Sequence, residues 1–244
     1  MAAKIHVELI SKRWGFSQPV KPVASNSVLR GKIIAFICGA QSGILADMRL
    51  PAGDSLLMQI TSAAFAESAE RAGEHLVCRP GCTQCCHGAF ALNPLDALRL
   101  RTGMDILRAT EAPLAAQIEV RARAWVAEHG AEFPGDAETG VLGTSIVDQE
   151  RFEDFANEAA CPALDKATGR CDVYAYRPMT CRAFGPPVRV GDGDALAHCE
   201  LCFTGAEAPD VMACEMTVPH DLEAELLEEI PTKEETVVAY ALLG

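Results

Sequence analysis

The sequence predicts a mainly α-helical protein with little strand, in which a small helical domain carries irregular cysteine-rich loops organised around a metal site. Apolar residues recur at helical spacing in residues 54–75, 94–102 and 113–129. The stretch from Cys161 to Cys202 has many turn residues and little periodicity. Apolar residues make up 49% of the 244 residues, so a core can form without disulfide bonds.

The predicted elements begin with a short buried strand at 31–38, followed by a helix at 54–75. Gly53 and Asp54 stand at the start of this helix. Its apolar residues fall on one face, which comprises Leu56, Leu57, Ile60 and Ala64.

Asn93 and Pro94 form a predicted cap and first turn for the next helix, which we expect to stop at Gly103. A third helix at 113–129 precedes Gly130 and has an apolar face of Leu114, Ile118 and Trp125. Residues 133–145 are rich in turn residues, and 148–160 are predicted to be helical.

We divide the chain into an N-terminal extension with a lead-in helix (1–74), a cysteine-cluster metal-binding domain (75–205) and an acidic C-terminal helical tail (206–244). The acidic run DLEAELLEEI at 221–230 is expected to be a solvated helix face, with a docking segment as the alternative.

The net charge of −13 disfavours binding to nucleic acid or to anionic lipid. We find no apolar core of a signal peptide near residue 1, and the apolar run at 33–40 is too short to span a bilayer. We therefore expect a cytoplasmic protein without a membrane partner. Thiols stay reduced in the cytoplasm, where clustered cysteines more often indicate metal or redox chemistry than disulfides.

The run CRPGCTQCCHG holds four of the eleven cysteines. Cys78, Cys82 and Cys85 have the spacing C-x3-C-x2-C, which suits one face of an iron–sulfur cluster or three corners of a zinc tetrahedron. Cys86 follows directly. The thiols of Cys85 and Cys86 would point apart in an extended chain and serve two metals, but could converge in a tight turn. The spacing also resembles a radical-SAM motif, although the strand–helix repeats of that barrel do not follow it.

A second set of cysteines comprises Cys161, Cys171, Cys181, Cys199 and Cys202. Ligand bonds could replace the core contacts that this irregular segment lacks, and thiolates suit zinc, copper(I) and iron–sulfur clusters. The pair Cys199 and Cys202 could complete a zinc site, bind a second centre or act as a dithiol. The isolated Cys38 and Cys214 are expected to be small buried side chains.

Three further side chains are expected beside the metal ligands. Arg177 and Arg182 could offset the negative charge of several thiolates, and Tyr174 could pack over the site. The alternative for the arginines is pairing with surface carboxylates. His87 and His198, each next to a cysteine, are either extra ligands or bystanders.

The two cysteine motifs in this order resemble the YkgJ-type cysteine-cluster family, a domain described as zinc- or iron-chelating with a CxxxCxxCC signature. The resemblance covers roughly 75–190. It rests on Cys78 to Cys86, on Cys161, on the string from Cys171 to Arg182 and on Phe184. It implies metal or iron–sulfur binding. A related cluster occurs in the flagellin lysine-N-methylases, so the resemblance leaves open a methylase-like enzyme that acts on a protein.

From these observations we expect an iron–sulfur cluster or iron as the cofactor, with redox or cosubstrate-binding chemistry. The alternatives are a structural zinc-binding interaction module and a thiol–disulfide protein. No phosphate-binding or nucleophile motif names a substrate, so the partner stays an unknown protein or small molecule. We also expect that Cys78–Cys86 and Cys161–Cys181 contribute to one shared centre, so that loss of Cys82 or of Cys181 would have similar effects.

Overall fold

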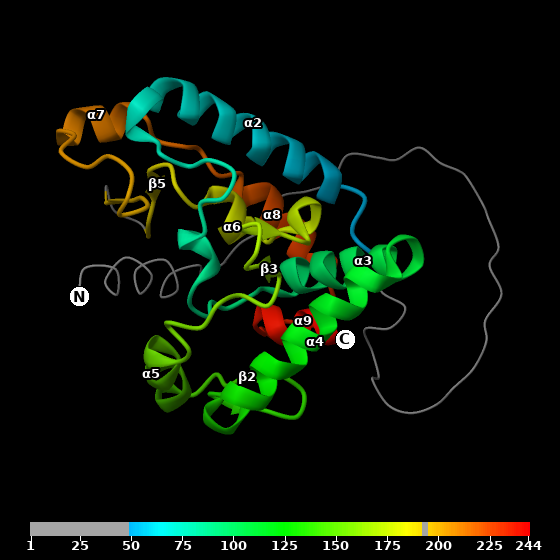
Figure 1. Ribbon diagram of the computed structural model, residues 1–244. Helices are drawn as coiled ribbons and strands as arrows, with labels where there is room; N and C mark the ends of the chain where they lie inside the picture. Colours follow the sequence, from blue (N-terminus) through cyan, green and yellow to red (C-terminus); the bar gives the residue numbers. More distant parts are fainter. Residues whose placement is uncertain (1–48, 192–194) are drawn as a thin grey trace.

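The computed structural model describes residues 49–191 and 195–244 (Figure 1). Helices dominate these residues, and the strands within them occur as short antiparallel pairs. The prediction of a mainly α-helical fold with little strand is confirmed. The strand predicted at 31–38, with Cys38, lies outside the described residues.

The α-helices are α2 (Asp54–Ala72), α3 (Pro94–Thr110), α4 (Ala112–His129), α5 (Ile146–Asp154), α6 (Met179–Ala183), α7 (Ala208–Ala213), α8 (His220–Glu228) and α9 (Val238–Leu243). The 3₁₀-helices are η1 (Gly73–His75), η2 (Gln84–Cys86), η3 (Gly130–Glu132) and η4 (Tyr174–Tyr176). Strand β1 (Gly135–Asp136) pairs with β2 (Val141–Leu142), β3 (Leu164–Asp165) with β4 (Arg170–Cys171), and β5 (Val188–Arg189) with β6 (Leu196–Ala197).

The start of α3 follows its sequence signals, but its end does not. The Asn93 side chain accepts a hydrogen bond from the Asp96 amide at 2.9 Å, and Pro94 occupies the first turn. The stop expected at Gly103 is wrong, because α3 continues to Thr110. A Cβ atom at Gly103 would lie 2.4 Å from Cγ of Tyr176. A glycine at position 103 therefore allows η4 to pack closely on α3, at a modest cost in helix propensity.

The apolar face predicted for α2 is only partly correct. Leu57 is fully buried, but Leu56 and Ile60 are 51% and 40% exposed. Thr61 is buried instead, because its hydroxyl donates to the Leu57 carbonyl at 2.8 Å and needs no water. The helix expected at 148–160 begins earlier and is shorter, since Ser145 caps it and Ala156 has a positive φ of 50°.

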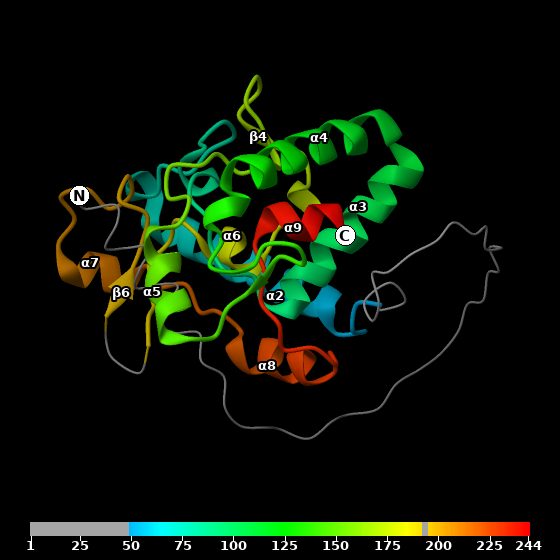
Figure 2. The same ribbon diagram turned by 90° about the horizontal axis from the view of Figure 1, so that it is seen from below.

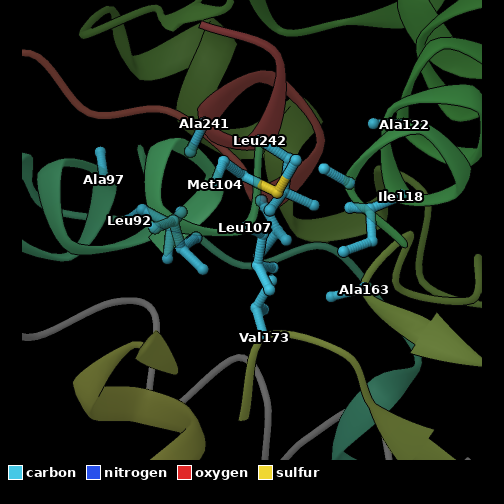
Figure 3. Packing of buried hydrophobic residues seen from close by; sticks show 13 residues of the cluster. Leu92, Ala97, Met104, Leu107, Ile118, Ala122, Ala163, Val173, Ala241 and Leu242 are labelled. Carbon is cyan, nitrogen blue, oxygen red and sulfur yellow. The ribbon is translucent and has the colours of Figure 1, made fainter. Parts of the chain in front are cut away.

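The C-terminal helices are part of the core. Helix α9 packs against both α3 and α4 (Figures 1 and 2). Leu242 of α9 lies beside Met104 and Leu107 of α3 at the centre of the cluster in Figure 3. Helix α8 contributes Leu226 and Leu227 to a second cluster, which contains Leu57 of α2. The acidic run at 221–230 was expected to be solvated, but it is solvated on one side only. The three-part division of the chain stays a prediction.

A buried charged network connects α2, α3 and α6. Arg99 is 2% exposed, and its guanidinium contacts the carboxylates of Asp54 (2.5 Å) and Asp96. Asp96 also accepts a hydrogen bond from the Met179 amide at 2.9 Å. Since Met179 is the first residue of α6, this network fixes the helix that carries Cys181.

Glu223 of α8 completes this network, and its environment predicts a pH-dependent stability. Its Oε1 accepts a hydrogen bond from Asn93 at 2.9 Å, while Oε2 has no partner among the described residues. Burial, followed by the charge of Asp96, raises the pKa of Glu223 to about 7. Since the folded state holds this proton more tightly than the unfolded chain, the stability present below the unfolded pKa is lost as pH rises through 7.

Glu223→Gln should therefore raise the free energy of unfolding by about 1–3 kcal/mol above pH 7 and change little below pH 4.5 or so. Urea unfolding of both proteins across this pH range measures the difference. Glu225→Gln, at an exposed position of the same helix, is the control. A gain independent of pH would contradict the assignment.

Within the described residues, no helix is both long and apolar enough to cross a membrane.

Candidate metal centre

The first cysteine motif is folded by two successive turns. The Cys82 amide donates to the Arg79 carbonyl at 2.9 Å, and the Cys86 amide donates to the Thr83 carbonyl at 2.8 Å. Cys85 and Cys86 therefore lie in the tight turn of η2, and their thiols are hydrogen-bonded to each other. The pair therefore does not adopt the extended conformation in which the two thiols would point apart.

The second motif lies directly against the first. The Cys161 amide donates to the Cys86 carbonyl at 2.8 Å, and the Gly88 amide donates to the Ala159 carbonyl at 2.9 Å. Gly88 has a φ of +87°, which suits glycine, and a Cβ there would lie 3.2 Å from the Asn157 carbonyl oxygen. Helices α3 to α5 thus form an excursion from which the chain returns to its first cysteines.

Helix α4 holds the next segment in place. Arg121 donates to the Pro162 carbonyl at 2.8 Å and to the Asp172 carboxylate at 2.5 Å. These contacts lie beside Cys161 and Cys171, whose segments also meet through the pairing of Leu164 with Cys171 between β3 and β4. No sequence signal identified Arg121, because it is distant from both cysteines in the chain.

Four cysteines from separate segments form what we call the first thiol group: Cys85, Cys161, Cys171 and Cys181. Burial raises the pKa of Cys161 to about 12, and the charges of Cys171 and Cys85 add to this effect. Burial also raises the pKa of Cys181, again with contributions from Cys161, Cys85 and Cys171. The hydrogen bond that the Cys85 thiol donates to Cys86, and then burial, raises the pKa of Cys85.

The side chains expected beside these thiols have different roles. The Arg177 guanidinium lowers the pKa values of Cys85, Cys171 and Cys181 against the larger effects that raise them. It also lies 3.8 Å from the centroid of the exposed Tyr174 ring, a cation–π contact. Arg182 donates to the main-chain carbonyls of Arg177 (3.0 Å) and Ala175 (2.5 Å), so it stabilises the loop.

Four of the five remaining cysteines of both motifs form the second thiol group: Cys78, Cys82, Cys199 and Cys202. The fifth, Cys86, is hydrogen-bonded to Cys85 of the first thiol group. Burial raises the pKa of Cys78 to about 12, with further contributions from Cys202, Cys199 and Cys82. Burial raises the pKa of Cys199 to about 11, with Cys202 and Cys82 contributing. Cys82 and Cys181 belong to different groups, whereas Cys85 of the first motif lies with Cys161 and Cys181 of the second. The similar effects expected for loss of Cys82 and of Cys181 stay a prediction.

Three residues near the cysteines make other contacts. Nδ1 of His87 lies 3.0 Å from the Thr83 carbonyl, and Nδ1 of His198 lies 3.0 Å from the Cys199 carbonyl. Cys214 is buried in an apolar cluster with Ala72 and Phe203, as expected for a cysteine that fills space.

In the described part of the chain, no three His, Cys, Asp or Glu side chains are arranged with the geometry of a metal site. Thiol–thiol hydrogen bonds instead join Cys85 to Cys86, and Cys202 to both Cys78 and Cys199. Rotation about χ1 moves a cysteine sulfur without moving the backbone, so the positions of the sulfur atoms can change while the fold stays the same. The donor set itself suits a soft or borderline metal such as zinc or iron.

A mainly helical frame with clustered cysteines in its loops defines the protein as a cysteine-rich metal-binding protein. In a comparison with protein-family models, residues 77–202 match CxxCxxCC, the "Putative zinc- or iron-chelating domain". The match spans more than half of the chain, which therefore belongs to this family and confirms the family expected from the motifs. Neither a search of curated proteins nor a search of solved structures found a match.

Proposed function

We propose that the first thiol group binds an iron–sulfur cluster or iron, with zinc as the alternative. One observation carries this proposal. The Nε atom of Arg177 is buried beside these thiols and has no hydrogen-bond partner among the described residues. A buried N–H without a partner is costly, and a metal-bound thiolate or a cluster sulfide would accept its hydrogen bond.

The charge of the group supports the same proposal. Raised pKa values keep Cys161 and Cys181 protonated at neutral pH, and a metal cation would stabilise their thiolates. Several thiolates around one centre carry excess negative charge, which Arg177 offsets at close range. When bound, an iron–sulfur cluster would supply electron transfer, and nearby positive charge would favour its reduced form.

The number of thiols does not decide between the metals. A single zinc ion cannot use all the clustered cysteines, and that fact alone would favour a multinuclear iron centre. Two groups of four would, however, suit two zinc ions equally well. The preference for iron at the first thiol group therefore rests on Arg177, because the positive charge of its guanidinium would favour the reduced form of an iron–sulfur cluster.

Analysis of the full chain purified without oxygen tests this proposal. We expect broad visible absorption together with iron and acid-labile sulfide, and we expect Cys171→Ser to abolish both. Cys214→Ser is the matched control for the first thiol group, since Cys214 is a buried cysteine that packs in the cluster containing Cys199 and Cys202. Zinc in a colourless protein would establish the alternative, and a protein that retains neither metal in the first thiol group would refute the proposal.

Arg177→Met should lower the affinity of the first thiol group for its metal by about 10- to 100-fold, the usual effect of losing a partner of the ligands. Competition with a chelator of known affinity measures this change. Arg123→Met, at a more exposed position on α4, should leave the affinity unchanged. Equal affinities of the Arg177 variant and the unmodified protein would show that the guanidinium does not contact the centre.

A further inference from the structure

The second thiol group is built from two short cysteine pairs on two distant segments. Cys78 and Cys82 are separated by three residues in the first motif, and Cys199 and Cys202 by two residues after β6. Two local pairs of this kind are typical ligands of a structural zinc ion bound by four cysteines. The first thiol group, in contrast, takes each of its cysteines from a different segment.

The β5–β6 hairpin brings the two pairs together. Gly185 precedes this hairpin, and its carbonyl accepts a hydrogen bond from the Cys199 amide at 3.2 Å after the chain has returned. The Cys202 amide then donates to the Cys199 carbonyl at 2.9 Å, which forms a tight turn. Both cysteines of this turn are buried.

Gly185 also provides the space for Cys78. Its φ of +125° favours glycine, and a Cβ there would lie 2.7 Å from Sγ of Cys78. The sulfur of the first motif thus packs directly on the main chain that anchors Cys199. Cys78 and Cys202 are within hydrogen-bonding distance of each other.

Two further contacts fix the loop that follows. The Phe203 amide donates to the His75 carbonyl at 2.8 Å, and Gln84 donates to the Glu200 carboxylate at 2.8 Å. Phe203 has a φ of +57°, an uncommon conformation for a residue with a side chain. The backbone immediately after Cys202 is therefore held in an unfavourable conformation that tertiary contacts maintain.

We propose that Cys78, Cys82, Cys199 and Cys202 form a second metal site, distinct from the first thiol group, which takes zinc or a similar soft divalent cation. This inference depends on the proposed function in one respect: Cys85, Cys161, Cys171 and Cys181 are assigned to the first thiol group and are therefore not ligands here. The side chains need rotation about χ1 to converge, while the hydrogen bonds of Cys199 and Cys202 already position their main chain.

The electrostatic surroundings distinguish this site from the first. Burial is the largest influence on the pKa values of Cys78 and Cys199, and thiols of the same group raise both of them further. The pKa values of Cys171 and Cys181 are also raised mainly by burial, but Arg177 lowers both. A zinc ion has no redox change to stabilise, so the second site needs no fixed positive charge for that purpose.

Alkylation of the full chain tests the proposal directly. The protein is stripped of metal under reducing conditions, titrated with zinc alone and treated briefly with N-ethylmaleimide, and each cysteine is quantified by peptide mass spectrometry. We expect Cys78, Cys82, Cys199 and Cys202 to become protected over one range of zinc concentration. Failure of zinc to protect these four, or a Cys78–Cys202 disulfide as their only reaction, would overturn the metal site.

Variants separate this inference from the proposed function. Cys202→Ser should release Cys78, Cys82 and Cys199 to alkylation together and remove about one zinc per chain, while Cys161 and Cys171 keep their protection. Loss of protection at all positions would show one shared centre and overturn two distinct sites. The first group could bind neither iron nor zinc while zinc still protects the second group from alkylation. That result would refute the proposed function and leave the second metal site standing.

Gly185→Ala provides a milder variant that retains every ligand. The added methyl group collides with Sγ of Cys78 and strains the backbone, so zinc protection of Cys78 and Cys199 should weaken while that of Cys171 persists. Gly205→Ala is the control, because Gly205 also has a positive φ (+75°) but a Cβ there meets nothing within 4 Å. Equal losses in both variants would overturn the role of Gly185 in this site.

Discussion

Replacing Arg99 by methionine should lower the free energy of unfolding by about 3–5 kcal/mol. Arg99 is almost fully buried and is the guanidinium shared by Asp54 and Asp96, with Glu223 close enough to influence it. Its removal leaves these carboxyl groups without compensation in a region that water does not reach. Urea unfolding of metal-loaded protein at neutral pH measures the loss.

Arg108→Met, on the same helix, is the matched control. Arg108 pairs with Asp105 and Glu119 at the surface, so its loss should cost less than about 1 kcal/mol. A similarly small effect of Arg99→Met would show that the buried carboxyl groups become protonated at little cost. We further expect the Arg99 variant to bind metal less tightly, because Asp96 holds the Met179 amide at the start of the helix that carries Cys181.

Metal removal should have the second large effect. Structural zinc contributes about 10–16 kcal/mol to the folding of small zinc domains, so a chelator under reducing conditions should loosen the cysteine-rich segments. Trypsin should then cleave faster after Lys166 and Arg170, which lie at the turn between β3 and β4 and at the start of β4. Peptide mass spectrometry at several times after addition of the protease measures these rates.

Cleavage after Arg123 is the internal control, since α4 packs on α3 and α9 and should persist without metal. Unchanged cleavage in fully metal-free protein would contradict a structural role of the metal. The segment from 161 to 202 was expected to lack core contacts, but the structure shows that several of its residues are buried. Val173, Met179 and Ala183 are buried in the hydrophobic clusters, so we expect loosening at the turns and not along the whole segment.

The helices were predictable from the sequence wherever the signal was local. The cap at Asn93 and Pro94 and the span of α4 depend on residues within one or two turns, and both agree with the structure. The continuation of α3 through Gly103 was not predictable, because it depends on the Tyr176 ring, which is distant in the chain. The burial of Glu223 in an acidic run has the same origin, since α2 and α3 surround it only after folding.

For the candidate site, the sequence by itself determined the donor atoms. Clustered cysteines and the motif around Arg177 are sufficient to predict a metal-binding domain, and the family match agrees with that prediction. Only the tertiary structure decided which thiols lie together. The division into two groups depends on the main-chain contact of Cys161 with Cys86 and on that of Cys199 with Gly185. These contacts join residues far apart in the chain, and spacing along a sequence constrains only those ligands that a single turn can bring together.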